Sequence, residues 1–164
     1  MKKLFYYNTA VGKIGIAEEY GFITNLYFMN MKQPLNAKQY ETDVLKEAFI
    51  QLCEYFGGKR KEFDLPLNPK GTNFQQTVWS ELLTIPFGKI KTYKDIAVAI
   101  GKPNSMRAVG NACNKNPIPI IIPCHRIISA TDKLTGYIGG LSLKEDLLDL
   151  EKTNIQQHKS QLYP

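Results

Sequence analysis

Residues 92–115 read Thr-Tyr-Lys-Asp-Ile-Ala-Val-Ala-Ile-Gly-Lys-Pro-Asn-Ser-Met-Arg-Ala-Val-Gly-Asn-Ala-Cys-Asn-Lys, and this stretch decides the fold of the second half of the chain. Its first part has a helix N-terminal signal at Thr92 and ends at a glycine. Its second part places Met106, Val109 and Cys113 on one helical face. Two short helices across a tight turn that contains glycine are typical of a helix-turn-helix. Many helical hairpins bind nothing, so the motif alone is weak evidence for nucleic-acid binding.

The positive charge of the sequence is concentrated in the same region. The chain has 21 Lys and Arg against 15 Asp and Glu, for a net charge of +6. Residues 70–126 carry eight basic and two acidic residues, which accounts for the whole excess. A basic segment is the electrostatic footprint of a polyanion partner, although a solvated lysine-rich face has the same composition. The coincidence of charge and motif favours nucleic-acid binding.

Length and composition exclude several other classes of protein. The 164 residues, 43% apolar and 22% charged, fit one globular domain or two small ones. The longest apolar stretch, residues 118–124, is too short to span a bilayer, and no apolar segment follows the N-terminal lysines. Three cysteines without short spacing argue against a disulfide framework and against a Cys-x-x-Cys zinc site. We therefore expect a cytoplasmic protein, or a nuclear one if the source is a eukaryote.

The first third of the chain predicts a separate domain. Its predicted elements are a hairpin over residues 13–17 and 22–28 and a helix over residues 42–56. Residues 63–73 carry two prolines and a glycine among polar residues, which predicts a linker. We therefore predict an N-terminal structural domain over residues 1–69 and a C-terminal domain over residues 70–164, which holds the basic segment and the helix-turn-helix.

Two further helices are predicted in the C-terminal part. Thr72 and Gln75 fit a capping box, and the helix that they start ends before a Pro-Phe-Gly sequence. Ser142 and Glu145 fit a second capping box, which starts a last helix that runs to Glu151. The polar tail beyond this helix is expected to fray.

The candidate nucleophile lies in residues 116–126, Asn-Pro-Ile-Pro-Ile-Ile-Ile-Pro-Cys-His-Arg. The prolines and β-branched residues predict a buried, extended segment that delivers Cys124 beside His125 and Arg126. Histidine and arginine beside a cysteine can lower the pKa of its thiol. A lower pKa increases the fraction of thiolate, which is the nucleophilic form. Neighbours in an extended segment point to opposite sides, so a water or a small turn would have to relay a proton from Cys124 to His125. A core cysteine beside a surface histidine is the alternative interpretation.

The segments together resemble the O6-alkylguanine-DNA alkyltransferases, whose active-site signature looks like Pro-Cys-His-Arg preceded by Asn-Pro-x-Pro-Ile-Ile-Ile. Further segments similar to that family in order and spacing are Gly71-Thr72-x-Phe74-Gln75-x-x-Val78-Trp79, Ile85-Pro86-x-Gly88, Thr92-Tyr93-x-Asp95-Ile96-Ala97, Arg107-Ala108-Val109-Gly110, Gly136-Tyr137-x-Gly139-Gly140 and Lys144-x-x-Leu147-Leu148-x-x-Glu151. The resemblance is strong over residues 63–152 and loose over residues 1–62. It implies an α/β (α+β) fold, in which a ribonuclease H-like sheet-plus-helix domain precedes a mostly helical, winged-helix-like domain with a helix-turn-helix.

The resemblance also implies an activity. The family transfers the alkyl group of O6-alkylguanine in duplex DNA to a cysteine, once per protein molecule, after flipping the base out from the minor groove. O4-alkylthymine is a further candidate substrate. By this resemblance Cys124 is the acceptor, the Tyr93 hydroxyl is the donor to the departing guanine, and Asn116 braces the network. His125, oriented by Glu151, would reach Cys124 through a water. The resemblance implies no metal and no organic cofactor. The expected partner is duplex DNA that contains O6-alkylguanine. The protein is expected to act as a monomer and not to associate with a membrane.

Two groups of residues are implied to contact the DNA and the flipped base. The implied DNA-binding residues are Arg107, Ala108, Gly110, Thr92 and Arg126. The implied base-pocket residues are Tyr137, Ile138, Gly139, Met106 and Ile127. Arg107 would fill the space that the flipped base leaves. Ile138 stands where many relatives carry a small polar residue; a contact made by its backbone N–H would survive this change, while a side-chain contact would not.

Three other functions fit parts of the pattern. A non-catalytic lesion binder of the same fold is disfavoured because Cys124 is present. A cysteine hydrolase would use Cys124 and His125 but would leave the helix of Arg107 and the basic segment unexplained. A transcription factor that reads sequence through residues 92–116 would prefer particular undamaged duplexes.

Overall fold

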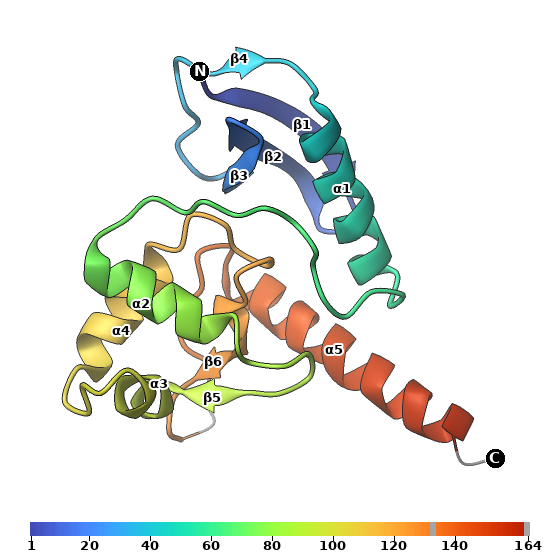
Figure 1. Cartoon of the computed structure of the whole chain (residues 1–164). Coiled ribbons are helices and arrows are strands. Elements are labelled where there is room, and N and C mark those ends of the chain that lie inside the picture. The colour runs from blue at the N-terminus through green and yellow to red at the C-terminus, as the bar shows by residue number, and fades with distance from the viewer. Residues whose placement is uncertain (132–133, 163–164) are drawn as a thin grey trace. The chain divides into compact units, whose positions relative to one another are not determined.

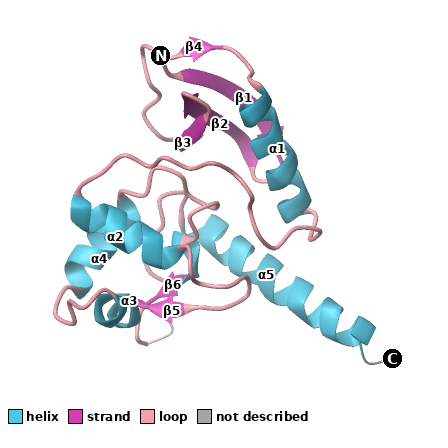
Figure 2. Cartoon of the chain, in the orientation of Figure 1, coloured by secondary structure: helices cyan, strands magenta, loops and turns pink. Residues whose placement is uncertain are grey.

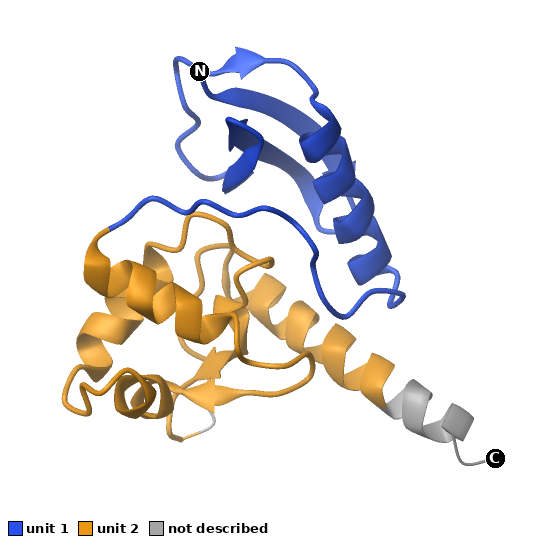
Figure 3. Cartoon of the chain, in the orientation of Figure 1, with its two compact units in different colours: residues 1–71 blue, residues 72–164 orange. Residues whose placement is uncertain are grey.

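The structure is a computed structural model, and it describes residues 1–131 and 134–162, with the side chains of the last helix described as far as residue 155. The chain forms two compact units, unit 1 over Met1–Gly71 and unit 2 over Thr72–Pro164 (Figure 3). This division falls slightly later than the boundary predicted between residues 69 and 70.

Unit 1 is a four-stranded sheet with one helix, α1, along one face (Figures 1 and 2). The strand order is β3-β2-β1-β4, and the elements are β1 (Lys3–Thr9), β2 (Gly12–Glu19), β3 (Phe22–Phe28), β4 (Lys38–Gln39) and α1 (Asp43–Phe56). The predicted hairpin is confirmed, since β2 and β3 pair antiparallel across a turn at Tyr20 and Gly21, both at positive φ. Strand β1 was not predicted, although it pairs with β2 along its whole length.

Helix α1 has the boundaries that its sequence specifies. The Thr42 hydroxyl accepts a hydrogen bond from the amide of Leu45, and Gly57 ends the helix. The helix is attached to the sheet by aromatic packing, in which the rings of Tyr7 and Phe49 stack 4.3 Å apart. Part of the predicted linker pairs with the edge of the sheet at β3. The amide of Ile23 donates to the carbonyl of Pro66, and the carbonyl of Ile23 accepts from the amide of Asn68.

Unit 2 is mostly helical and contains the predicted helix-turn-helix. Its elements are α2 (Asn73–Leu82), β5 (Lys91–Thr92), α3 (Tyr93–Ala99), α4 (Met106–Asn114), the 3₁₀ turn η1 (Cys124–Arg126), β6 (Ile127–Ile128) and α5 (Leu141–Leu162). The capping box of Thr72 and Gln75 is present, and Thr92 and Asp95 form a second one at the start of α3. The buried Trp79 fixes α2 against α4 by donating its indole N–H to a carbonyl of α4, 2.8 Å away.

Two local predictions in unit 2 are wrong. Helix α5 begins at Leu141, so Ser142 is inside the helix and does not cap it; the amide of Lys144 bonds to the carbonyl of Gly140 instead. The helix also continues to Leu162, beyond the predicted end at Glu151. Among the described residues, no helix combines the length and the apolar character needed to cross a bilayer.

The segment that delivers the cysteine is also not the extended strand that its composition predicts. The chain turns at Ile120, whose φ is 74°, and the amide of Ile122 bonds back to the carbonyl of Ile118 at 2.9 Å. The segment then enters η1, in which Cys124 is the first residue. The prolines prevent a helix, as predicted, but in this segment they lead to a compact turn.

Candidate active site

Cys124 is buried at the end of a turn that one amide side chain holds together. The Asn116 Nδ2 donates to the carbonyl of Ile122 at 2.9 Å, and its Oδ1 accepts from the amide of Ile118 at 3.0 Å. Asn116 is fully buried, so these bonds form in a low-dielectric environment. The same side chain also hydrogen-bonds to Cys124. Asn116 therefore fixes both the turn and the thiol.

A buried ionic network lies directly beside the thiol. His125 Nε2 lies 2.6 Å from Oε2 of Glu151, and both side chains are at most 1% exposed. The guanidinium of Arg126 donates to both Glu151 oxygens, at 2.8 and 3.1 Å, and to the carbonyl of Ile85 at 2.7 Å. The amide of Gly88 donates to Glu151 Oε1 at 2.9 Å. One carboxylate of α5 therefore connects η1 to the loop that follows α2.

The hydrogen bonds of this network determine its protonation. Burial alone would raise the pKa of Glu151, but the bonds from His125 and Arg126 hold it at about 2. An ionised carboxylate only accepts hydrogen bonds, so His125 Nε2 is the donor in its contact with Glu151. Burial lowers the pKa of His125, so its ring is neutral at pH 7 and carries its lone pair on Nδ1. Such a ring can accept a proton.

Arg126 was expected to bind DNA, and its position does not fit that role. Its side chain is 7% exposed, and its guanidinium donates to Glu151 and to Ile85. A guanidinium matches a carboxylate in bidentate geometry, so Arg126 neutralises Glu151 inside the unit. We place Arg126 in the buried network.

The thiol itself is less activated than its neighbours in sequence suggest. Burial raises the pKa of Cys124 to about 11, while the hydrogen bond from Asn116 and the charge of Lys144 oppose this rise. Cys113 on α4 is also buried, and burial raises its pKa to about 12. In the DNA-free protein Cys124 is a neutral thiol, and a base must remove its proton when it reacts.

Lys144 is a site residue that the sequence analysis did not single out. It is 1% exposed, and its ammonium donates to the carbonyls of Ile127, at 2.5 Å, and of Thr135, at 3.3 Å. A signal was present in the sequence, since Lys144, Leu147 and Glu151 lie on one helical face. The two charged residues on this buried face of α5 are the ones that act on His125 and Cys124.

Tyr93 lies at the start of α3, where its hydroxyl contacts the segment before Tyr137. The Tyr93 Oη is 2.7 Å from Oγ1 of Thr135. Gly110 of α4 lies near the ring, since a Cβ atom built on this glycine would be 3.7 Å from a ring carbon. The Tyr93 side chain therefore contacts Thr135 through its hydroxyl and lies close to α4.

The other predicted residues divide between the surface and the interior. Arg107 and Ala108 lie on α4 and are exposed. Five lysines elsewhere in unit 2 are also exposed, namely Lys89, Lys91, Lys94, Lys102 and Lys115. The side chain of Thr92 caps α3. Tyr137, Ile138 and Gly139 are half-buried, and Met106 is 46% exposed. Ile127 is fully buried in β6.

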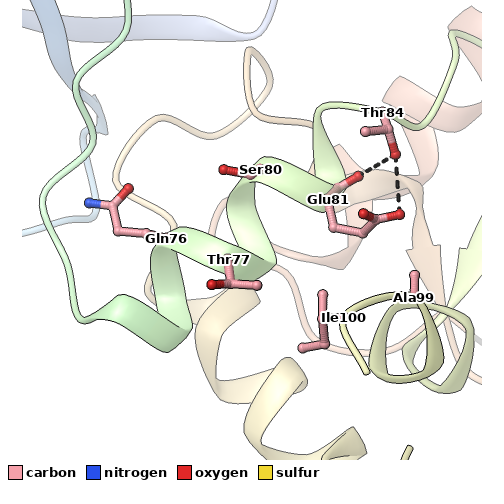
Figure 4. A pocket seen from close by; sticks show the side chains of 7 residues that line it. All are labelled: Gln76, Thr77, Ser80, Glu81, Thr84, Ala99 and Ile100. Carbon is pink, nitrogen blue, oxygen red and sulfur yellow. Dashed lines mark hydrogen bonds between the residues drawn. The ribbon is translucent and has the colours of Figure 1, made fainter. Parts of the chain in front are cut away.

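Two cavities lie apart from the thiol. An open groove of about 520 Å³ between α2 and the end of α3 is lined by Gln76, Thr77, Ser80, Glu81, Thr84, Ala99 and Ile100 (Figure 4). A second cavity of about 460 Å³ borders Glu151 and Gly88 on the side of β6. Neither includes Cys124, and within the described part of the chain no three His, Cys, Asp or Glu residues are grouped to hold a metal ion.

The fold and the site together define a class of protein. A helix-turn-helix unit with an exposed arginine on its second helix encloses a buried cysteine, which lies beside a neutral histidine and an ionised glutamate. These features define a protein that combines a DNA-binding motif, the helix-turn-helix, with a cysteine nucleophile and a histidine base.

Comparison with known proteins makes the identification specific. A family model described as "6-O-methylguanine DNA methyltransferase, DNA binding domain" matches residues 73–153, and one described as "6-O-methylguanine DNA methyltransferase, ribonuclease-like domain" matches residues 3–69. The constitutive methylated-DNA–protein-cysteine methyltransferase of Bacillus subtilis is 44% identical, over 93% of this chain and 98% of its own length. The chain belongs to the 6-O-methylguanine DNA methyltransferase family.

Solved structures agree with this assignment. The Mycobacterium tuberculosis O6-methylguanine methyltransferase is 41% identical with a TM-score of 0.87, covering 94% of both chains. A structure of the M. tuberculosis protein OGT in complex with DNA is 42% identical with the same TM-score of 0.87, covering 93% of this chain and 94% of that one. The predicted α/β fold class, with a ribonuclease-like sheet domain before a helical DNA-binding domain, is confirmed.

Proposed function

We propose that this protein repairs O6-alkylguanine in duplex DNA by transferring the alkyl group to Sγ of Cys124. The observation that carries the proposal is the buried Cys124, beside His125 and Glu151, inside a unit whose second helix exposes Arg107. Family membership supports the reaction, because the relatives are named methylated-DNA–protein-cysteine methyltransferases.

The chemistry follows from the protonation of the network. His125 Nδ1 takes the thiol proton, directly or through a water, and the ion pair of Glu151 and Arg126 fixes the ring for this step. The S–C bond forms as the C–O6 bond breaks, and the electron pair passes to the guanine. The Tyr93 hydroxyl donates to the departing guanine. The thioether product is stable, so each protein molecule reacts once.

The DNA must present the alkyl group to a buried thiol, which requires the base to leave the helix stack. We place α4 in the minor groove, with Arg107 in the space that the base vacates. The exposed lysines of unit 2 then neutralise phosphates, which makes binding strongly salt-dependent. We further propose that the protein acts as a monomer, in the compartment that holds the DNA.

The test is the intact mass of the protein before and after mixing with duplex DNA that contains O6-methylguanine. We expect a gain of one methylene unit per chain, on Cys124, that does not increase when more DNA is added. Cys113→Ala is the matched control, because Cys113 is also a buried thiol and should be dispensable. Cys124→Ala should lose transfer but keep its affinity for DNA. Modification of Cys113 or Cys53 instead, or repeated turnover as in a hydrolase, would overturn the proposal.

A second measurement tests the role of Arg107. A flipped base leaves a gap that a planar guanidinium can fill and an ammonium cannot. Arg107→Ala and Arg107→Lys should both slow repair of duplex substrate by tenfold or more, yet leave transfer from free O6-benzylguanine nearly unchanged. A Lys variant as fast as the wild type on duplex would reduce Arg107 to a phosphate contact. Equal losses on both substrates would indicate that Arg107 only supports the fold.

A further inference from the structure

The hydroxyl of Tyr93 already has a partner in the DNA-free protein. Its Oη lies 2.7 Å from Oγ1 of Thr135, a residue 42 positions further along the chain. Thr135 directly precedes the segment of Tyr137 and Gly139 that is proposed to contact the base. Since each hydroxyl has one hydrogen, the direction of this hydrogen bond decides whether Tyr93 can donate to anything else.

Only one direction is compatible with a donor role for Tyr93. If Tyr93 donates to Thr135, it has no hydrogen left for the guanine. If Thr135 donates to Tyr93, the phenolic hydrogen remains available for the guanine, and accepting a hydrogen bond strengthens the phenol as a donor. We propose that Thr135 is a positioning residue, which donates its hydroxyl hydrogen to Tyr93 Oη and thereby directs the Tyr93 O–H at the departing purine. This inference rests on the proposed function.

The position of Thr135 suits such a role. Its carbonyl accepts a hydrogen bond from the buried ammonium of Lys144 at 3.3 Å, which ties this part of the loop to α5. A β-branched side chain has few rotamers, so a fixed backbone also fixes the direction of its hydroxyl. The Tyr93 ring also lies close to Gly110 of α4. Burial raises the pKa of Tyr93, and the hydrogen bond with Thr135 opposes that rise.

The proposal is consistent with the balance of the reaction. Cys124 loses its proton to His125 and gains the alkyl carbon, while the C–O6 bond breaks and its electron pair moves into the purine. A purine nitrogen takes up the proton that Tyr93 supplies, solvent restores the phenol, and His125 returns the thiol proton to solvent. The net change transfers the alkyl group to sulfur and one proton to guanine. Thr135 forms and breaks no covalent bond, which is why its effect must be measured through Tyr93.

The experiment is a double-mutant cycle on single-turnover transfer from duplex DNA with O6-methylguanine, measured at saturating protein. Thr135→Val replaces the hydroxyl by a methyl group of similar size and should slow transfer about tenfold, an effect of the size of one lost hydrogen bond. Thr135→Ser keeps the hydroxyl and should stay within about twofold of the wild type. Tyr93→Phe should slow transfer, and adding Thr135→Val to it should have no further effect. DNA affinity should be unchanged in all four variants.

A control reaction isolates the proton donor from the thiol. Chloroacetamide alkylates Cys124 with chloride as the leaving group, which needs no proton, so its rate at Cys124 should be the same in every variant. Thr135→Val as fast as the wild type would overturn the inference. An equal loss with and without the Tyr93 hydroxyl would also overturn it, since Thr135 would then act only on the loop. Absence of transfer by the wild-type protein would instead defeat the proposed function, so the two failures are distinguishable.

Discussion

Replacing Arg126 by lysine is predicted to destabilise unit 2 strongly and to leave DNA binding unchanged. The guanidinium makes three hydrogen bonds, two to the Glu151 carboxylate and one to the carbonyl of Ile85. A lysine ammonium is a point charge on a flexible stem and cannot reproduce the planar fork. We therefore expect Arg126→Lys to lose about two of the three bonds.

The expected magnitude follows from the burial of these groups. Hydrogen bonds to charged groups are each worth about 1.5–3 kcal/mol, so the loss of two of them places the cost of Arg126→Lys at about 3–6 kcal/mol. With a urea dependence of about 2 kcal/mol per M, the unfolding midpoint should fall by about 1.5–3 M.

Tryptophan fluorescence provides the assay. The chain has one tryptophan, Trp79, and it is buried in α2, so its emission reports the unfolding of unit 2. Arg107→Lys is the matched control, because this exposed arginine should change the free energy of unfolding by no more than about 0.5 kcal/mol. The reasoning is refuted if Arg126→Lys unfolds at the wild-type midpoint, as the same substitution of an exposed arginine would.

Three further changes test other parts of the site. Glu151→Gln should reduce the loss of stability that the protein shows in acid. The pKa of Glu151 is lowered from 4.5 to about 2, so the stability that the ionised carboxylate contributes is lost as the pH falls from about 4.5. The decrease in the urea midpoint between pH 7 and pH 3 should therefore be smaller in the variant than in the wild type. Trp79→Phe should cost about 1–3 kcal/mol through the lost indole hydrogen bond, measured by circular dichroism, and an unchanged midpoint would contradict the packing described. Gly88→Ala should cost more than Gly101→Ala, since both glycines have positive φ but an added Cβ meets Ile155 only at Gly88; equal urea midpoints would speak against this contact.

Helix starts were predictable because they depend on residues three positions apart. Thr72 with Gln75 marks the start of α2 in the sequence, and Thr92 marks that of α3. The same local reasoning failed at Ser142, where a capping pattern lies inside a helix that Gly140 starts. Strand β1 was missed because its two neighbouring tyrosines obscure the alternation that marks a strand.

The roles of the buried charges were not predictable from local patterns. Arg126 follows the motif of Cys124 and His125, and nothing in its neighbourhood indicates that its partner lies on α5. The raised pKa of Cys124 has the same origin, because burial is set by the packing of the whole unit and not by adjacent residues. The helical face that Lys144 shares with Glu151 is visible in the sequence, but the contacts of Lys144 and Thr135 within the site are tertiary.

The carboxylate of Glu151 also determines when the reactive centre can exist during synthesis of the chain. Its partners Gly88, Arg126 and His125 precede it by 63, 25 and 26 residues. A ribosome therefore completes the nucleophile and its base well before it adds the anion that orients them. Until α5 docks, Arg126 has no buried counterion and the ring of His125 has no fixed direction. A nascent chain thus carries Cys124 before its base is oriented, and the site is completed only when α5 has been made.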